Sequence, residues 1–173
     1  LIRHLLDKQV KENVLYSEIF LGPHLWSDTP SNRWERFLEI ASKAADEYKK
    51  KYGIHTFFII VCIRHLGPEK ALEASKFASK AKSYNVVGFG MAGDEKKFNT
   101  LDFMESFNFA RNSGLGITTH AGEICGAKSV DEAIQLGVTR IGHGVRASES
   151  EETIIKLTEK NILLEICPGS NIA

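Results

Sequence analysis

Residues 115–123, Leu-Gly-Ile-Thr-Thr-His-Ala-Gly-Glu, pass from a short β-branched segment directly into a histidine, a glycine and a carboxylate. Short apolar, β-branched runs are typical of buried strands, and glycine marks a turn. We interpret Leu115–Thr119 as a strand and Ala121–Lys128 as the loop after it. His120 and Glu123 then lie at the strand's carboxyl end, where β/α proteins hold side chains rigidly beside pocket-forming loops.

A second short strand ends in the same way, at the sequence Ile-Gly-His-Gly over residues 141–144. His143 leaves this strand with a glycine on each side, and glycine permits the sharp turn expected there. The carboxyl ends of neighbouring parallel strands share one edge of a sheet. The sequence therefore predicts that His120, Glu123 and His143 converge on one candidate site.

Strand-like and helix-like segments alternate along the rest of the chain. Besides 115–119, the segments that we interpret as strands cover residues 14–20, 54–63, 86–90 and 162–167, with a short one ending near 143. Helical patterns cover residues 1–12, 68–83 and 99 or 100 to 112, and another starts at Ser31 or Asn32 and ends before Gly53. This alternation predicts one βα-repeat domain with a parallel sheet.

Two further helices are expected from capping-box patterns, in which a serine precedes a glutamate by three residues. Ser129 with Glu132 predicts a short helix that ends at Gly137, and Ser148 with Glu151 predicts one that ends near Asn161. Residues 22–30 form a long loop rich in turn residues, and residues 168–171 begin the loop after the last strand.

The composition is that of an ordinary globular domain, because 43% of the 173 residues are hydrophobic and 25% are charged. Lys and Arg number 22, as do Asp and Glu, so no basic surplus favours nucleic acid or an acidic membrane. A small uncharged ligand fits this balance better. No apolar run of ~18 residues and no signal-peptide pattern is present, which makes the cytoplasm the expected location. Three widely spaced cysteines indicate free thiols.

Three short motifs follow one another along the chain: Met91-Ala-Gly-Asp-Glu95, Thr119-His-Ala-Gly-Glu123 and Ile141-Gly-His-Gly144. In their sequences, order and spacing they resemble the adenosine deaminase family, and the similarity extends from about Tyr16 to Asn171. The resemblance implies a zinc-dependent (β/α)8 barrel of the TIM type. Its reaction is the hydrolysis of the 6-amino group of adenosine or adenine, with one Zn²⁺ in each complete site.

The resemblance also assigns roles to individual residues. His120 is expected to bind zinc, and Glu123 is expected to protonate purine N1 as water attacks C6, which requires a neutral carboxyl. His143 is expected to take or orient the proton of the water. The backbone N–H of Gly93 is expected to donate to purine N3, and a glycine allows the close approach that this contact needs.

The chain departs from the family pattern in length and in its ligands. A full barrel takes about 250 residues, so we expect residues 1–173 to be a single partial deaminase barrel domain with about six of eight βα units, lacking the first and last strands. Those strands carry the family's His-x-His pair and an aspartate ligand, so the isolated chain is expected to be inactive, poorly stable or self-associating. Gly90 replaces an aspartate that many adenosine deaminases carry. Adenosine is the expected substrate of the complete protein, with adenine or another 6-aminopurine as the alternative.

Other readings of the sequence are weaker. An open, doubly wound α/β domain is the alternative fold, although no strand is followed by a glycine-rich phosphate loop. A cysteine hydrolase would use Cys125 or Cys167 with a histidine, although a small buried thiol explains both cysteines. Asp94 and Glu95 are expected to cap or pair within their loop. His24 and His65 follow strands and are expected not to touch ligand.

Overall fold

A parallel sheet of six strands organises the computed structural model, which describes residues 1–26 and 32–172. The strands lie in the sheet in their order along the chain, from β1 to β6. They are β1 (Tyr16–Leu21), β2 (His55–Ile63), β3 (Val86–Ala92), β4 (Gly116–Ala121), β5 (Arg140–His143) and β6 (Leu163–Glu165). A doubly wound sheet reverses its strand order at a switch point, whereas a barrel does not. The partial TIM-type barrel is therefore confirmed.

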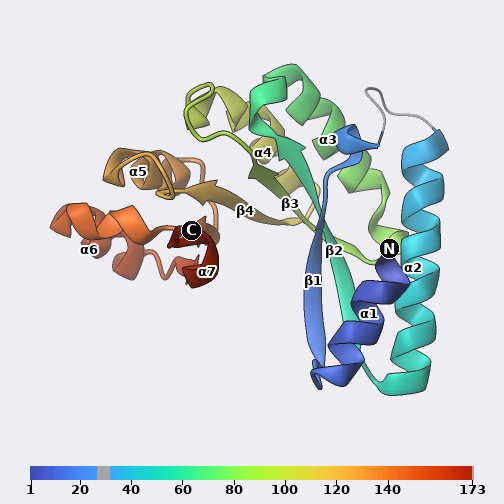
Figure 1. Ribbon diagram of the computed structural model, residues 1–173. Coiled ribbons are helices and arrows are strands. Elements are labelled where there is room, and N and C mark those ends of the chain that lie inside the picture. Colours follow the sequence, from blue (N-terminus) through green and yellow to red (C-terminus); the bar gives the residue numbers. More distant parts are fainter. Residues whose placement is uncertain (27–31, 173) are drawn as a thin grey trace.

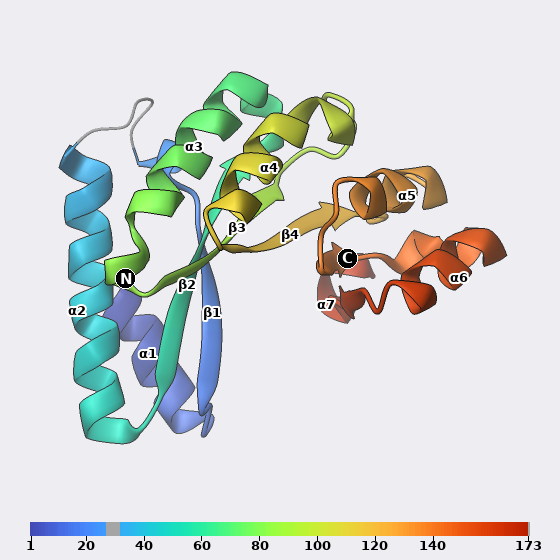
Figure 2. The same ribbon diagram turned by 180° about the vertical axis from the view of Figure 1, so that it is seen from behind.

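The main helices are α1 (Ile2–Lys11), α2 (Asn32–Tyr52), α3 (Pro68–Lys80), α4 (Met104–Asn112), α5 (Ala127–Gln135), α6 (Glu151–Glu159) and α7 (Pro168–Asn171). Helix α1 precedes β1, each of the others follows a strand, and the helices α2 to α6 cover one face of the sheet. Strand β1 lies in front in Figure 1, and α3 and α4 lie in front of the strands when the molecule is seen from behind in Figure 2. No helix among the described residues is long and apolar enough to cross a membrane.

The core lies between the sheet and these helices. Strand β2 is buried on both faces, as its continuous apolar sequence predicts, and alternate residues Phe58, Ile60 and Cys62 point into the helical layer. Phe107 of α4 packs edge-on against Phe89 of β3, with ring centroids 5.2 Å apart. This packing holds the middle of β3 against the helical layer.

The opposite face of the sheet is concave, and an ion-pair cluster crosses it. Arg140 of β5 binds Glu165 of the adjacent β6 at 3.4 Å and Glu18 of β1 at 2.6 Å. Strands β2, β3 and β4 separate β1 from β5 in the sheet, so the second contact exists only because the sheet curls strongly. A cavity of about 450 Å³ lies above this cluster, with His120 and Phe20 in its wall.

Several local predictions were wrong. Helix α5 begins at Ala127 with Gly126 as N-cap, because the hydroxyl of Ser129 bonds to Glu95 instead of capping the helix. Helix α6 is capped by Ser150 and not by Ser148. Residues 168–171 form the short helix α7 rather than a loop, since Pro168 suits a first helical turn.

Other boundaries moved by a few residues. Helix α3 ends at Lys80 and a separate 3₁₀ turn follows it, while Asn99 caps a 3₁₀ turn that leads into α4. Helix α2 ends just before Gly53, whose φ of 74° is the left-handed conformation expected of a helix-ending glycine. The expected loop over residues 27–30 and the expected cap at Ser31 lie outside the described residues.

Candidate active site

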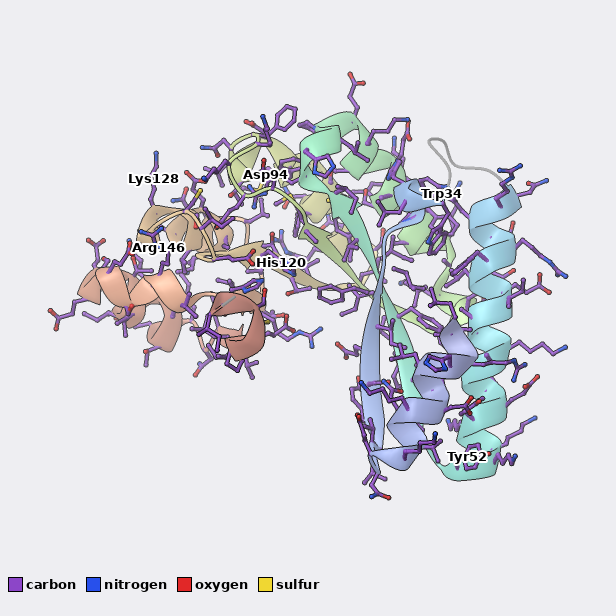
Figure 3. All side chains as sticks on the ribbon, in the orientation of Figure 1. Trp34, Tyr52, Asp94, His120, Lys128 and Arg146 are labelled. Atoms are coloured by element: carbon purple, nitrogen blue, oxygen red, sulfur yellow. The ribbon has the colours of Figure 1, made fainter. Side chains whose placement is uncertain are left out.

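His120 lies on the inner face of the sheet near the end of β4. It pairs in register with Gly142 of β5, and its imidazole covers that glycine. A Cβ atom at Gly142 would lie 2.6 Å from Cδ2 of His120, which is too close for any side chain. The glycine that the sequence places before His143 is therefore required by the position of His120. Figure 3 shows His120 near the centre of the molecule, beside β4.

His143 ends β5 in a conformation that is unusual for its residue type. Its φ is 67°, in the left-handed region, and only 4% of its surface is exposed. Its ring stands nearly perpendicular to that of His120, with centroids 4.9 Å apart. Its Nδ1 lies 3.2 Å from Nδ2 of Asn171 in α7. The short helix after β6 therefore helps to fix this imidazole.

Glu123 joins the two histidines from the loop after β4. Its carboxylate lies 3.5 Å from Nε2 of His143. One potential ligand atom from each of His120, Glu123 and His143 lies within 4.8 Å of the others. The structure thus brings together the three side chains that the sequence placed at two strand ends, and such a group can bind a divalent cation or transfer protons.

Burial sets the protonation of His120. Removal from water lowers the pKa of this imidazole, and the neighbouring His143 lowers it further. His120 is therefore neutral at pH 7, with a nitrogen lone pair free to bind a metal. This donor fits a zinc ion, which prefers neutral imidazole nitrogen and carboxylate oxygen.

Arg64 supports His120 from behind and was not anticipated from the sequence. It follows β2, is 2% exposed, and donates from Nη2 to the backbone carbonyl of His120 at 3.2 Å. Its Nη1 donates to the hydroxyl of Thr100 at 3.0 Å. The position of Arg64 in the sequence could have indicated this contact. Arg64 directly follows the most apolar strand, and the carboxyl end of that strand lies at the same edge of the sheet as His120.

Gly93 and the two other strand-end histidines lie outside this group of three. Gly93 follows β3 with a φ of 102°, and a Cβ atom there would lie 3.2 Å from Nδ1 of His65. His24 is buried, with its ring 4.7 Å from that of Trp34 and its Nε2 3.4 Å from the carboxylate of Glu73. His24 therefore contacts Glu73 and Trp34 and is not part of the group formed by His120, Glu123 and His143.

Comparison with known proteins agrees with this geometry. A family model described as "Adenosine deaminase" matches residues 1–173. The chain belongs to the adenosine deaminase family. The family membership expected from the three motifs is confirmed, and the partial barrel agrees with the fold expected of this family.

Relatives within the adenosine deaminase family are named for adenine. The chain is 40% identical to an adenine deaminase of Agrobacterium fabrum and 41% identical to one of Rhizobium rhizogenes, in each case over 97% of this chain and 52% of the relative. A solved adenine deaminase from Arthrobacter aurescens superposes with a TM-score of 0.88 at 26% identity, covering 99% of this chain and 52% of that one. The chain thus spans about half the length of the relatives that it matches.

Proposed function

We propose that this protein deaminates a 6-aminopurine by hydrolysis, with adenine as its substrate. The observation that carries the proposal is the convergence of His120, Glu123 and His143 at the carboxyl ends of β4 and β5 in a chain of the adenosine deaminase family. The names of the relatives favour adenine over adenosine, which was the first expectation from the sequence. Gly90, where many adenosine deaminases carry aspartate, agrees with this preference.

Zinc is the proposed cofactor, and His120 is the residue of this chain proposed to hold it. A bound Zn²⁺ supplies a water of lowered pKa, so that a nucleophile exists at neutral pH. The 173 residues contain no His-x-His pair, so the ligands beyond His120 are proposed to come from outside this chain. The neutral state of His120 supports its role as a ligand.

The other residues are proposed to move protons and orient the purine. Glu123 donates a proton to purine N1 while the oxygen of water bonds to C6. His143, 3.5 Å from Glu123, takes the proton of that water, and Asn171 fixes its ring. The backbone N–H of Gly93 donates to N3. His143 would then return its proton to the amino nitrogen and the C6 hydroxyl would return one to Glu123, so that the bond from C6 to nitrogen breaks and adenine gives hypoxanthine and ammonia.

A cysteine hydrolase receives no support from the site. Burial raises the pKa of the Cys125 thiol, and the nearby charge of Glu95 raises it further. Cys125 is therefore protonated at neutral pH and is a poor nucleophile. The three cysteines are free, which agrees with a reducing compartment such as the cytoplasm, our proposed location.

Substitution of Glu123 by glutamine in the full-length protein tests the proposal. The amide cannot give up a proton as the acid does, so we expect kcat for ammonia release from adenine to fall about 10²–10⁴-fold. Zinc content, measured by atomic absorption, should be unchanged. Glu151→Gln, an exposed carboxylate on α6, is the matched control and should keep full activity.

Two results would count against the proposal. Near-normal turnover by Glu123→Gln would show that the proton donor is another group. A kcat/KM for adenosine above that for adenine in the unmodified protein would show that the substrate is the nucleoside and not the base.

A further inference from the structure

The carboxylate of Glu95 binds the loop that carries Glu123. Glu95 lies in the loop after β3 and is 5% exposed. Its Oε1 accepts hydrogen bonds from the backbone N–H of Gly122 at 2.5 Å and the hydroxyl of Ser129 at 2.7 Å. Its Oε2 accepts from the backbone N–H groups of Ile124 at 2.7 Å and Cys125 at 2.8 Å. One buried side chain therefore accepts hydrogen bonds from three backbone amides of a neighbouring loop and from a hydroxyl in the first turn of α5.

These hydrogen bonds hold Glu95 in its charged form. Burial opposes the charge, but the hydrogen bonds from Cys125, Ile124, Ser129 and Gly122 outweigh it, so the pKa of this carboxyl is lowered. Hydrogen bonds to a charged acceptor contribute more to stability than hydrogen bonds between neutral groups. The loop is thus fastened by an anion that stays ionised at neutral pH.

The bonded amides flank Glu123 on both sides. The N–H of Ile124 belongs to the peptide that joins Glu123 to Ile124, and the N–H of Gly122 belongs to the peptide just before Gly122, so Glu95 holds the backbone on both sides of Glu123. Gly122 has a φ of 66°, and a Cβ atom there would lie 2.6 Å from the side chain of Val130, so the turn itself tolerates little movement. The guanidinium of Arg146 also donates to the backbone carbonyl of Ile124 from the far side of the loop.

The geometry points to Glu95 as the positioning residue for Glu123. This inference rests on the proposed function, because it concerns the carboxyl that we propose as the proton donor. Glu95 acts through the loop backbone. By binding the amides of residues 122 and 124, it keeps the carboxyl of Glu123 at its 3.5 Å distance from His143. Neither substrate nor metal needs to touch it.

Asp94 provides a matched control from the same loop. It is the neighbouring carboxylate, it is exposed, and its side chain accepts a hydrogen bond from the backbone N–H of Lys96 within its own loop. Asp94→Asn therefore makes the same change of carboxylate to amide one position away, without touching the loop of Glu123.

The test compares Glu95→Gln, Glu95→Asp and Asp94→Asn in the full-length protein by amide hydrogen exchange and by steady-state kinetics. Glutamine lacks the charge, and its amide has only one oxygen that can accept hydrogen bonds. Hydrogen exchange at the backbone amides of residues 122, 124 and 125 should therefore speed up on the order of tenfold or more relative to the amides of β4. For adenine, kcat should fall about 10²-fold with KM within about twofold. Aspartate keeps the charge and should restore part of both losses.

Three results would contradict the role of Glu95 in positioning Glu123. Unchanged exchange in a folded Glu95→Gln protein would overturn the inference, as would faster exchange with full kcat, or equal losses in Asp94→Asn. If Glu95→Gln does not fold, Ser129→Ala removes one of the four donors and should give the same pattern with smaller changes. An unmodified protein that releases no ammonia from any aminopurine would refute the proposed function alone, and the exchange data would still decide whether Glu95 holds the loop.

Discussion

Replacing Gly142 by alanine should displace the imidazole of His120. The added Cβ would lie 2.6 Å from Cδ2 and 3.3 Å from Nε2 of that ring. Carbon atoms in contact sit about 3.5–4.0 Å apart, so the ring must retreat by about 1 Å. The backbone of Gly142 is not in the left-handed region, so alanine adds no backbone strain and the effect is purely one of space.

The size of the effect follows from the small tolerance of such sites. A misplacement of about 1 Å lowers rates about 10²-fold, and overpacking costs about 1–3 kcal/mol of folding stability. We therefore expect Gly142→Ala in the full-length protein to remain folded, with weaker zinc retention after dialysis and kcat/KM for adenine reduced about 10²-fold. Atomic absorption, ammonia release and thermal unfolding measure the three quantities.

Gly116→Ala is the control for this prediction. It lies on β4, the strand of His120, but at the opposite end, and its added Cβ would meet the carbonyl oxygen of Val87 at an ordinary 3.5 Å. It should change neither zinc content nor rate. A folded Gly142→Ala protein with normal zinc retention and a rate within about twofold of normal would refute the reasoning that His120 is held by this glycine.

Two further predictions concern stability and thiol reactivity. Arg140→Met in the full-length protein leaves the partly buried carboxylates of Glu18 and Glu165 without the cation that they share, and we expect urea unfolding to show a loss of about 1–3 kcal/mol. Cys62 should resist iodoacetamide in the folded protein even at pH 9, because burial raises the pKa of its thiol to about 12 and thiolate appears only near that pH.

The controls for these two experiments come from the same chain. Arg36→Met removes an exposed guanidinium that pairs with Glu39 at 2.7 Å, and it should cost less than about 0.5 kcal/mol. Equal losses in the two arginine variants would contradict the prediction for Arg140. Unfolding in urea should make Cys62 react at the rate of a free thiol, and rapid labelling before unfolding would show that Cys62 is not buried.

The long, uniform elements of the fold were predictable from the sequence because their signals are local. Strand β2 is a continuous apolar run, and α2 ends where Gly53 allows the left-handed turn. The short edge strand β6 was harder. It was expected over residues 162–167 but covers only Leu163–Glu165, since it pairs with the four-residue strand β5 and the ladder cannot extend further.

Contacts between distant segments explain what the sequence could not predict in the site. The spacing of His120 and Glu123 after one strand was visible, because both leave the same element. Ser129 matched a capping box, but its hydroxyl is taken by Glu95, which lies 34 residues away, and no local pattern contains that partner. The role of Arg64 behind His120 depends on two strand ends meeting across the sheet.

The backbone conformation of His143 costs folding free energy. A left-handed residue other than glycine carries about 1–3 kcal/mol of strain, and glycine would adopt the same angles freely. The version of this chain that is simplest to fold therefore has no imidazole at position 143. The domain carries this strain as long as position 143 holds an imidazole, and the proton transfer that we propose is the chemistry that this ring would serve.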